Sequence, residues 1–227
     1  IASNEITHYP LIKKISKTKK PVIISTGMSN LKEVEKAYFT AKKNGASEII
    51  LLYCVSNYPA DFHDFNLENI KILKNKFKCK VGFSDHSIDN RIAMSAISAG
   101  ADIVEKHFAL KNQKSGLDVG FSIKGNELKI FKEDMKLAYQ MRGKPYFYVS
   151  RKERKNIKFR RSIYVTQNIK KGEKFSEKNI KVIRPNFGLC PSFYEKLLGK
   201  KSPYNFKKNT PLNKKAKKIL MNKYIKI

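Results

Sequence analysis

Four short apolar runs, each separated from the next by a segment with helical periodicity, constrain the fold of this chain more than any other feature. The runs, rich in β-branched residues, cover residues 21–25, 48–54, 79–83 and 101–105. Apolar residues recur at three- and four-residue spacing in the intervening segments, 31–44, 66–77 and 88–98. This alternation predicts a parallel sheet with helices as crossover connections. Because the strands are continuously apolar, we expect both faces of the sheet to be covered.

The repeat is long enough for about half of a closed barrel. A full (β/α)8 barrel needs roughly 31 residues per unit, and four such units fit into residues 21–142. The chain begins with Ile rather than Met, so we expect a fragment that lacks the amino-terminal barrel strands. A doubly wound open sheet is the alternative, although no glycine-rich phosphate-binding motif follows any run.

The pattern changes after Gly143. Residues 146–158 are basic, aromatic and aperiodic, which is typical of a linker. Two short strand-like runs, SIYV and KVIRP, then flank a KKGE turn and a helical turn. We therefore predict a barrel part over 1–145, a linker over 146–158 and a small, mostly β domain over 159–227, with a frayed basic tail from residue 213 onward.

The net charge of +29 suggests a polyanionic partner at first sight. Lysines supply nearly all of it, and they are spread along the chain rather than gathered in one stripe, so no nucleic-acid partner is predicted. The three scattered cysteines favour a reducing, cytoplasmic compartment over a disulfide framework. No apolar run reaches the ~18–20 residues of a membrane span, so no membrane partner is predicted.

Polar side chains follow the strand-like runs at matching positions, where parallel βα proteins place their reactive groups. His86 and His107, two of only four histidines, come directly after the third and fourth runs. Two imidazoles on neighbouring strands can bind one divalent cation and leave coordination positions open. Either histidine alone would more often have a structural role, and it is the pair at matching strand ends that favours a metal site.

Hydroxyl groups occupy equivalent positions along the chain, at Ser3, Ser25, Ser56 and Ser84. Each one alone is typical of a helix cap. Together they are suited to donate hydrogen bonds to a phosphate or carboxylate. Glu5 and Tyr58 lie in the same stretches and add a carboxylate and a phenol to the same predicted edge.

The motifs IISTGM, SNYP, GFSDHS, VEKHF and SGLDVGFS, followed by RSIYV, IKKGE and IRPNFGL, resemble the sialic acid synthases. The resemblance covers nearly the whole chain in order. It implies an α/β fold: the carboxyl-terminal half of a TIM (β/α)8 barrel followed by a small SAF (antifreeze-like, β-clip) domain, in a domain-swapped homodimer. It also implies a metal-dependent transferase that condenses phosphoenolpyruvate with an N-acetylated amino-hexose and releases phosphate.

The resemblance also implies roles for individual residues. His86 and His107 would bind Mn²⁺ or Mg²⁺, and with Glu5, as acid or base, they would be catalytic. The serines at 3, 25, 56 and 84 would hold phosphoenolpyruvate, while Glu5, Tyr58 and Asp118 would contact the amino-sugar. Arg184 would reach the partner's active site. Ser56 stands where the sialic acid branch usually has asparagine, which points to a sister branch. The family's amino-terminal strands, with an active-site lysine, are absent, so the chain alone is expected to be inactive.

The small-domain stretch RPNFGLCP and the LDVGFS motif resemble the pseudaminic acid synthase branch, which is therefore the predicted activity. The stretch SNEITHYPLIKKI and Tyr58 are shared with the other branches. N-acetylneuraminate or legionaminate synthase remains an alternative. So does a non-catalytic SAF-type module that binds polyanions.

Overall fold

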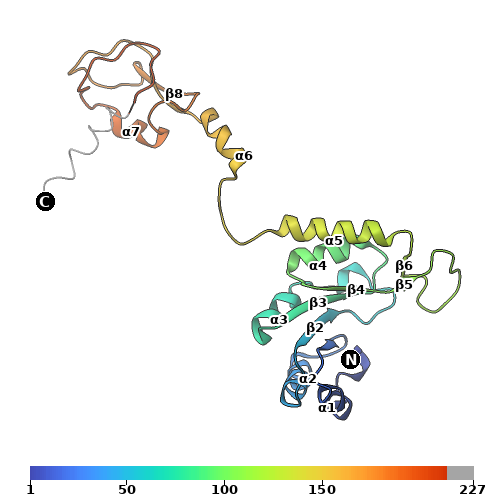
Figure 1. Ribbon diagram of the computed structural model, residues 1–227. Helices are drawn as coiled ribbons and strands as arrows, with labels where there is room; N and C mark the ends of the chain where they lie inside the picture. Colours follow the sequence, from blue (N-terminus) through green and yellow to red (C-terminus); the bar gives the residue numbers. More distant parts are fainter. Residues whose placement is uncertain (214–227) are drawn as a thin grey trace. The chain divides into compact units, whose positions relative to one another are not determined.

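The computed structural model describes residues 1–213 and divides the chain into two compact units, Ile1–Pro145 and Tyr146–Ile227 (Figure 1). The tail predicted to fray lies, from residue 214, outside the described residues. No helix of the described chain is long and apolar enough to cross a membrane.

The first unit is built on a four-stranded parallel sheet in the order β1-β2-β3-β4. The strands are β1 Val22–Ser25, β2 Ile49–Cys54, β3 Lys80–Asp85 and β4 Val104–Lys106. The helices that connect them are α2 Leu31–Lys43, α3 Asn69–Phe77 and α4 Asn90–Ala99, preceded by η1 Ser3–Glu5 and α1 Tyr9–Ser16. The predicted half-barrel of parallel strands is confirmed, and each strand lies within about three residues of its apolar run.

Local sequence explains where the connecting helices begin and which face they bury. Asn30 caps α2 by accepting from the backbone N–H of Glu33, whose carboxylate accepts in return from the backbone N–H of Asn30. The apolar face of each helix packs on the sheet, and the fully buried core includes Ile24, Leu51 and Phe83 from the strands. This packing holds the strands in place, and with them the side chains at their carboxyl ends.

The first residue of the chain lies beside β1 as a parallel neighbour would. The amino group of Ile1 donates to the Ile23 carbonyl, and the Ser25 N–H donates to the Ile1 carbonyl. The η1 turn follows at once. Ser3 and Glu5 therefore lie at the carboxyl-terminal edge of the sheet.

The chain beyond β4 adds a second, very short parallel pair, β5 Phe108–Ala109 with β6 Ile123–Lys124. A loop over residues 110–122 joins them. Helix α5 Leu128–Arg142 then packs along α4 (Figure 1). This pair was not predicted from the sequence, because a strand of two residues is too short to show an alternation of apolar and polar residues.

The second unit has an antiparallel pair, β7 Ser162–Val165 with β8 Ile180–Ile183, as the SAF-type prediction required. Short helical turns complete it: α6 Arg151–Arg154, η3 Lys155–Phe159, η4 Pro191–Phe193 and α7 Tyr194–Leu197. Its core is apolar, with Ile163, Phe175 and Leu212 among the fully buried side chains. The segment predicted as a linker contains α6, because Ser150 and Glu153 form a capping box.

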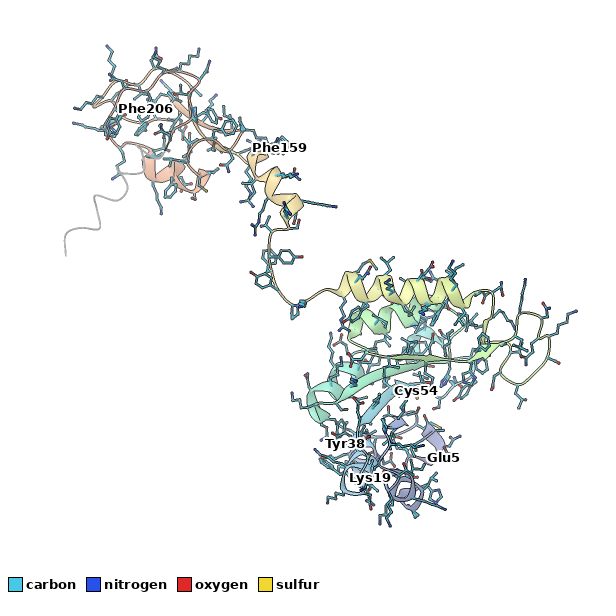
Figure 2. All side chains as sticks on the ribbon, viewed as in Figure 1. Glu5, Lys19, Tyr38, Cys54, Phe159 and Phe206 are labelled. Carbon is cyan, nitrogen blue, oxygen red and sulfur yellow. The ribbon has the colours of Figure 1, made fainter. Side chains whose placement is uncertain are left out.

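Two loops of this unit bind each other reciprocally. Asn168 Oδ1 accepts from the Lys208 N–H at 2.8 Å, and Asn205 Oδ1 accepts from the Lys171 N–H at 2.7 Å. Between them Ile169 and Phe206 exchange both backbone hydrogen bonds; Phe206 is marked in Figure 2. The sequences N-I-K-K and N-F-K-K thus form a local two-fold pair.

Candidate functional site

The structure brings the two strand-end histidines together at one edge of the sheet. The ring centroids of His86 and His107 lie 5.3 Å apart, with the ring planes inclined at 67°. His86 follows β3, and His107 lies between β4 and β5. The parallel register pairs Asp85 with Lys106, so each histidine comes one residue after a paired position and the two emerge at equal height.

Hydrogen bonds fix the protonation of the His86 ring. Its Nδ1 lies 2.8 Å from the Val55 carbonyl oxygen, which can only accept, so Nδ1 carries the hydrogen. Nε2 lies 3.4 Å from Ser84 Oγ, but Ser84 donates its hydrogen to Glu105 Oε1 at 2.8 Å. Burial lowers the pKa of His86, although the Val55 hydrogen bond acts in the opposite direction. Burial thus favours the neutral ring, in which Nε2 carries the electron pair.

His107 is contacted by the loop between β5 and β6. The Asp118 carboxylate lies 3.4 Å from His107 Nδ1, and the Phe121 ring centroid lies 4.9 Å from that of His107. The predicted sugar-contacting residue Asp118 is thus brought to a predicted metal ligand. A carboxylate at Nδ1 favours a hydrogen there and leaves the electron pair on Nε2.

Tyr58 lies over both imidazoles. Its ring centroid is 4.3 Å from that of His86 and 6.0 Å from that of His107, and about half of its surface is exposed. Burial raises the pKa of the Tyr58 phenol, with Cys54 adding to the shift and the nearby Ser56 hydroxyl opposing it. An aromatic wall beside a pair of imidazoles suits a sugar ring or an acyl group.

A second polar cluster lies at the ends of β1 and β2. Ser3 Oγ accepts from the Gly27 N–H at 3.1 Å and lies 3.2 Å from Cys54 Sγ. Figure 2 marks Cys54 and also Glu5, from η1. A methyl group on Gly27 would lie 2.0 Å from Ser56 Oγ and 2.8 Å from Ser3 Oγ, so only glycine lets these hydroxyls approach. Ser56 Oγ is buried and, among the described residues, has no hydrogen-bond partner.

Sequence reasoning missed two members of this edge, Glu105 and Gly27. Glu105 is the parallel partner of Ser84 and accepts its hydroxyl hydrogen. The signal was available, because Ser84 and Glu105 each stand two residues before a histidine. For Gly27 no signal was available, because the crowding arises from Ser3 of η1, from Cys54 at the end of β2 and from Ser56 just after it.

The remaining predicted site residues are placed as follows. Ser25 ends β1, and half-buried Glu5 ends η1, both at the same edge of the first unit. Arg184 follows β8 in the second unit. Its role in a partner's active site stays a prediction.

The donor set of the two rings fits a divalent cation. Each Nδ1 faces an acceptor, a backbone carbonyl for His86 and a carboxylate for His107, which is the outer-shell arrangement typical of metal-binding imidazoles. Within residues 1–213, no group of three or more His, Cys, Asp and Glu side chains is placed to hold a metal ion. The protein would supply two nitrogens here, and substrate or water oxygens would complete the coordination.

Comparison with known proteins gives two family matches: the model of the NeuB family matches residues 1–146, and that of the SAF domain matches residues 160–216. The N,N'-diacetyllegionaminic acid synthase of Campylobacter jejuni is 41% identical over 92% of this chain and 64% of its own length. The pseudaminic acid synthase of the same organism is 39% identical over 91% of this chain and 60% of its own length.

Among solved structures, the spore coat polysaccharide biosynthesis protein SpsE of Bacillus subtilis matches with a TM-score of 0.59 and 33% identity. The match covers 95% of this chain and 66% of that one. This chain therefore spans about three-fifths of the length of the curated relatives it matches.

Proposed function

Because this chain belongs to the NeuB family, we propose that it forms the carboxyl-terminal half of the catalytic barrel, and the SAF domain, of a nonulosonic acid synthase. In the reaction, C3 of phosphoenolpyruvate forms a carbon–carbon bond with the aldehyde carbon of an open-chain N-acetylated amino-hexose. Water adds at C2, and the C2–O bond to phosphate breaks. The products are a nine-carbon sugar acid and inorganic phosphate.

The observation that carries the proposal is the imidazole pair at neighbouring strand ends, 5.3 Å apart between ring centroids. His86 and His107 would hold a divalent cation, Mn²⁺ or Mg²⁺, through their Nε2 atoms. When bound, such a cation supplies Lewis-acid polarisation of the aldehyde oxygen. The Val55 carbonyl and the Asp118 carboxylate keep the two rings in the required tautomer.

The serine cluster supports phosphoenolpyruvate binding. The Ser3 and Ser56 hydroxyls both lie against Gly27, and the Ser56 hydroxyl, which has no partner among residues 1–213, is available to donate to an anion. Ser25 and Ser84 end or nearly end their strands at the same edge. These hydroxyls would hold the phosphate and carboxylate groups in reach of the aldehyde.

Glu5, Tyr58 and Asp118 would hold the amino-sugar. Glu5 would also transfer a proton to or from the aldehyde oxygen or the attacking water. Arg184 of the SAF domain would complete the site of a second copy in a domain-swapped homodimer. We place the reaction in the cytoplasm, in keeping with the free cysteines of the described chain.

For the product we propose pseudaminic acid, on the strength of the RPNFGLCP and LDVGFS stretches. The relatives include a legionaminic acid synthase and a pseudaminic acid synthase at nearly equal identity, so the two sugar precursors have to be compared directly.

The test is phosphate release by the full-length protein with a complete barrel, given Mn²⁺, phosphoenolpyruvate and either precursor. We expect release with the pseudaminic acid precursor, slower release with the legionaminic acid precursor and none when pyruvate replaces phosphoenolpyruvate. His107→Ala should abolish turnover. Release without any amino-sugar, or none with either, would contradict the proposal, and salt-dependent retention of polyanions without turnover would favour a binding module.

A further inference from the structure

A buried ion pair lies directly behind the two histidines. Asp85 ends β3 and has no exposed surface, and Lys106 ends β4 with a side chain 4% exposed. Lys106 Nζ lies 2.8 Å from Asp85 Oδ2, and the two residues are register partners. Each one immediately precedes a histidine in the sequence. The pair therefore ties together the last positions before His86 and His107.

The alternation of side chains along a strand separates this pair from the candidate site. Ser84 and Glu105 contact each other on the face that the two imidazoles share. Asp85 and Lys106, one residue further along each strand, project to the opposite face. Any effect of this pair on the two rings would therefore pass through the backbone of residues 86 and 107.

The hydrogen bonds of the pair also fix the turn that carries His86. Lys106 Nζ donates to the Ser87 carbonyl at 2.7 Å, and Asp85 Oδ1 accepts from the Ser87 N–H at 2.9 Å. Residues 85 and 87 are thus both held by one ammonium group, and His86 lies between them. A rotation of the His86 backbone would break at least one of these bonds.

Stability alone is a poor explanation for such a pair. Removing two charges from water is costly, and apolar residues of similar volume often stabilise a protein as well or better. A buried pair is better suited to specify one geometry. We propose that Asp85 and Lys106 form a positioning pair that sets the separation and orientation of the two imidazoles. This inference rests on the proposed metal-binding role of His86 and His107.

A second aspartate–lysine pair, between Lys74 of α3 and Asp102 just before β4, serves as a control, with both side chains 29% exposed. Lys74 Nζ lies 2.7 Å from Asp102 Oδ1 and donates to the Gly100 carbonyl at 2.6 Å. Asp102 Oδ2 accepts from the Val81 N–H at 3.1 Å, at the start of β3. This pair has the same chemistry and also joins β3 to the segment leading into β4, but it lies at the amino-terminal edge, away from the histidines.

The experiment compares Asp85→Asn/Lys106→Met with Asp102→Asn/Lys74→Met in the full-length protein. In the first double variant, the asparagine amide keeps an oxygen for the Ser87 N–H, and the methionine keeps the length of the lysine stem. The salt bridge is therefore removed without leaving an unpaired buried charge. Mn²⁺ affinity is measured by electron paramagnetic resonance. The His86–His107 contact is measured by ring-to-ring nuclear Overhauser effects in metal-free protein.

We expect the Asp85/Lys106 variant to bind Mn²⁺ about 10- to 100-fold more weakly and to lose the ring-to-ring effect, since outer-shell partners have consequences of this size. The Asp102/Lys74 variant should stay within about twofold of the parent. Equal affinities and an intact ring contact in the folded Asp85/Lys106 variant, or an equal loss in the control, would overturn the proposal. Lys106→Arg, which keeps the charge but changes its reach, gives an intermediate loss if the double variant does not fold.

The two measurements also separate this inference from the proposed function. If the parent protein binds no Mn²⁺ while the ring contact still depends on Asp85 and Lys106, the metal proposal fails and the positioning pair stands. If Mn²⁺ binds equally well to parent and variant, the metal proposal stands and the positioning pair fails.

Discussion

The two units bury polar side chains in different ways. In the second unit the buried Ser162, Asn179 and Ser202 all donate hydrogen bonds to backbone carbonyls. In the first unit nearly all the buried polar residues lie at the carboxyl ends of strands, and an ion pair and an imidazole lie there. Half-buried Ser56 lies there too, and its hydroxyl has no hydrogen-bond partner within residues 1–213. We call a buried polar group closed when its hydrogen bonds are made within the unit, and open when it has no partner there; closed groups serve the fold. A buried polar group without such a bond, like Ser56, calls for another explanation, and ligand binding is the one proposed above.

The largest expected effect is on the second unit alone. Phe175 is fully buried in its core, and Phe175→Ala should cost about 3–5 kcal/mol, enough to unfold a domain of this size. Phe187→Ala, at an exposed phenylalanine of the same unit, is the control and should cost less than about 0.5 kcal/mol. Hydrogen exchange resolved by unit provides the measurement. Loss of protection in β1–β4 as well would show that the two units do not fold separately.

Ser162→Ala tests a closed polar group. Its hydroxyl donates to the Pro185 carbonyl at 2.7 Å and accepts from the Gly188 N–H at 2.9 Å. Truncation leaves both partly buried backbone groups without this partner, so the second unit should lose about 2–3 kcal/mol of unfolding free energy in urea titration. A loss below about 0.5 kcal/mol would mean that water replaces the hydroxyl.

Gly27→Ala tests the crowding of the serine cluster. The added methyl group must push aside the hydroxyls of Ser3 and Ser56, at an expected cost of about 1–2 kcal/mol to the first unit. Phosphoenolpyruvate binding, measured by calorimetry on the full-length protein, should weaken by about tenfold or more. Gly120→Ala is the matched control, because no atom lies within 4 Å of its added methyl group. Unchanged binding in Gly27→Ala would remove the serine cluster from the anion site.

Ser56→Ala should have the smallest effect on folding and the sharpest contrast with Ser162→Ala. The Ser56 hydroxyl has no hydrogen bond to lose, so the unfolding free energy should change by less than about 0.5 kcal/mol. Phosphoenolpyruvate binding should nevertheless weaken. If Ser56→Ala destabilises the first unit as much as Ser162→Ala does the second, the distinction between closed and open polar groups fails.

Much of this arrangement follows from the sequence. Apolar runs predicted all four strands of the larger parallel sheet, and the rule that parallel strands end at one edge brought His86 and His107 to the same place. The contact of Asp118 with His107 could not be predicted by that rule, because it depends on the path of the loop over 110–122. Strand periodicity also gave no indication that Lys106 and Asp85 pair behind the site, since pairing depends on register between strands.

The reciprocal asparagines of the second unit provide a built-in duplicate. Asn168 and Asn205 accept the same kind of backbone hydrogen bond in two loops that face each other, within one polypeptide and one solvent condition. Any difference between the effects of the same substitution at the two positions then reports the surroundings of each loop rather than the chemistry of the side chain. The domain thus offers its own repeat measurement of how context alters a single interaction.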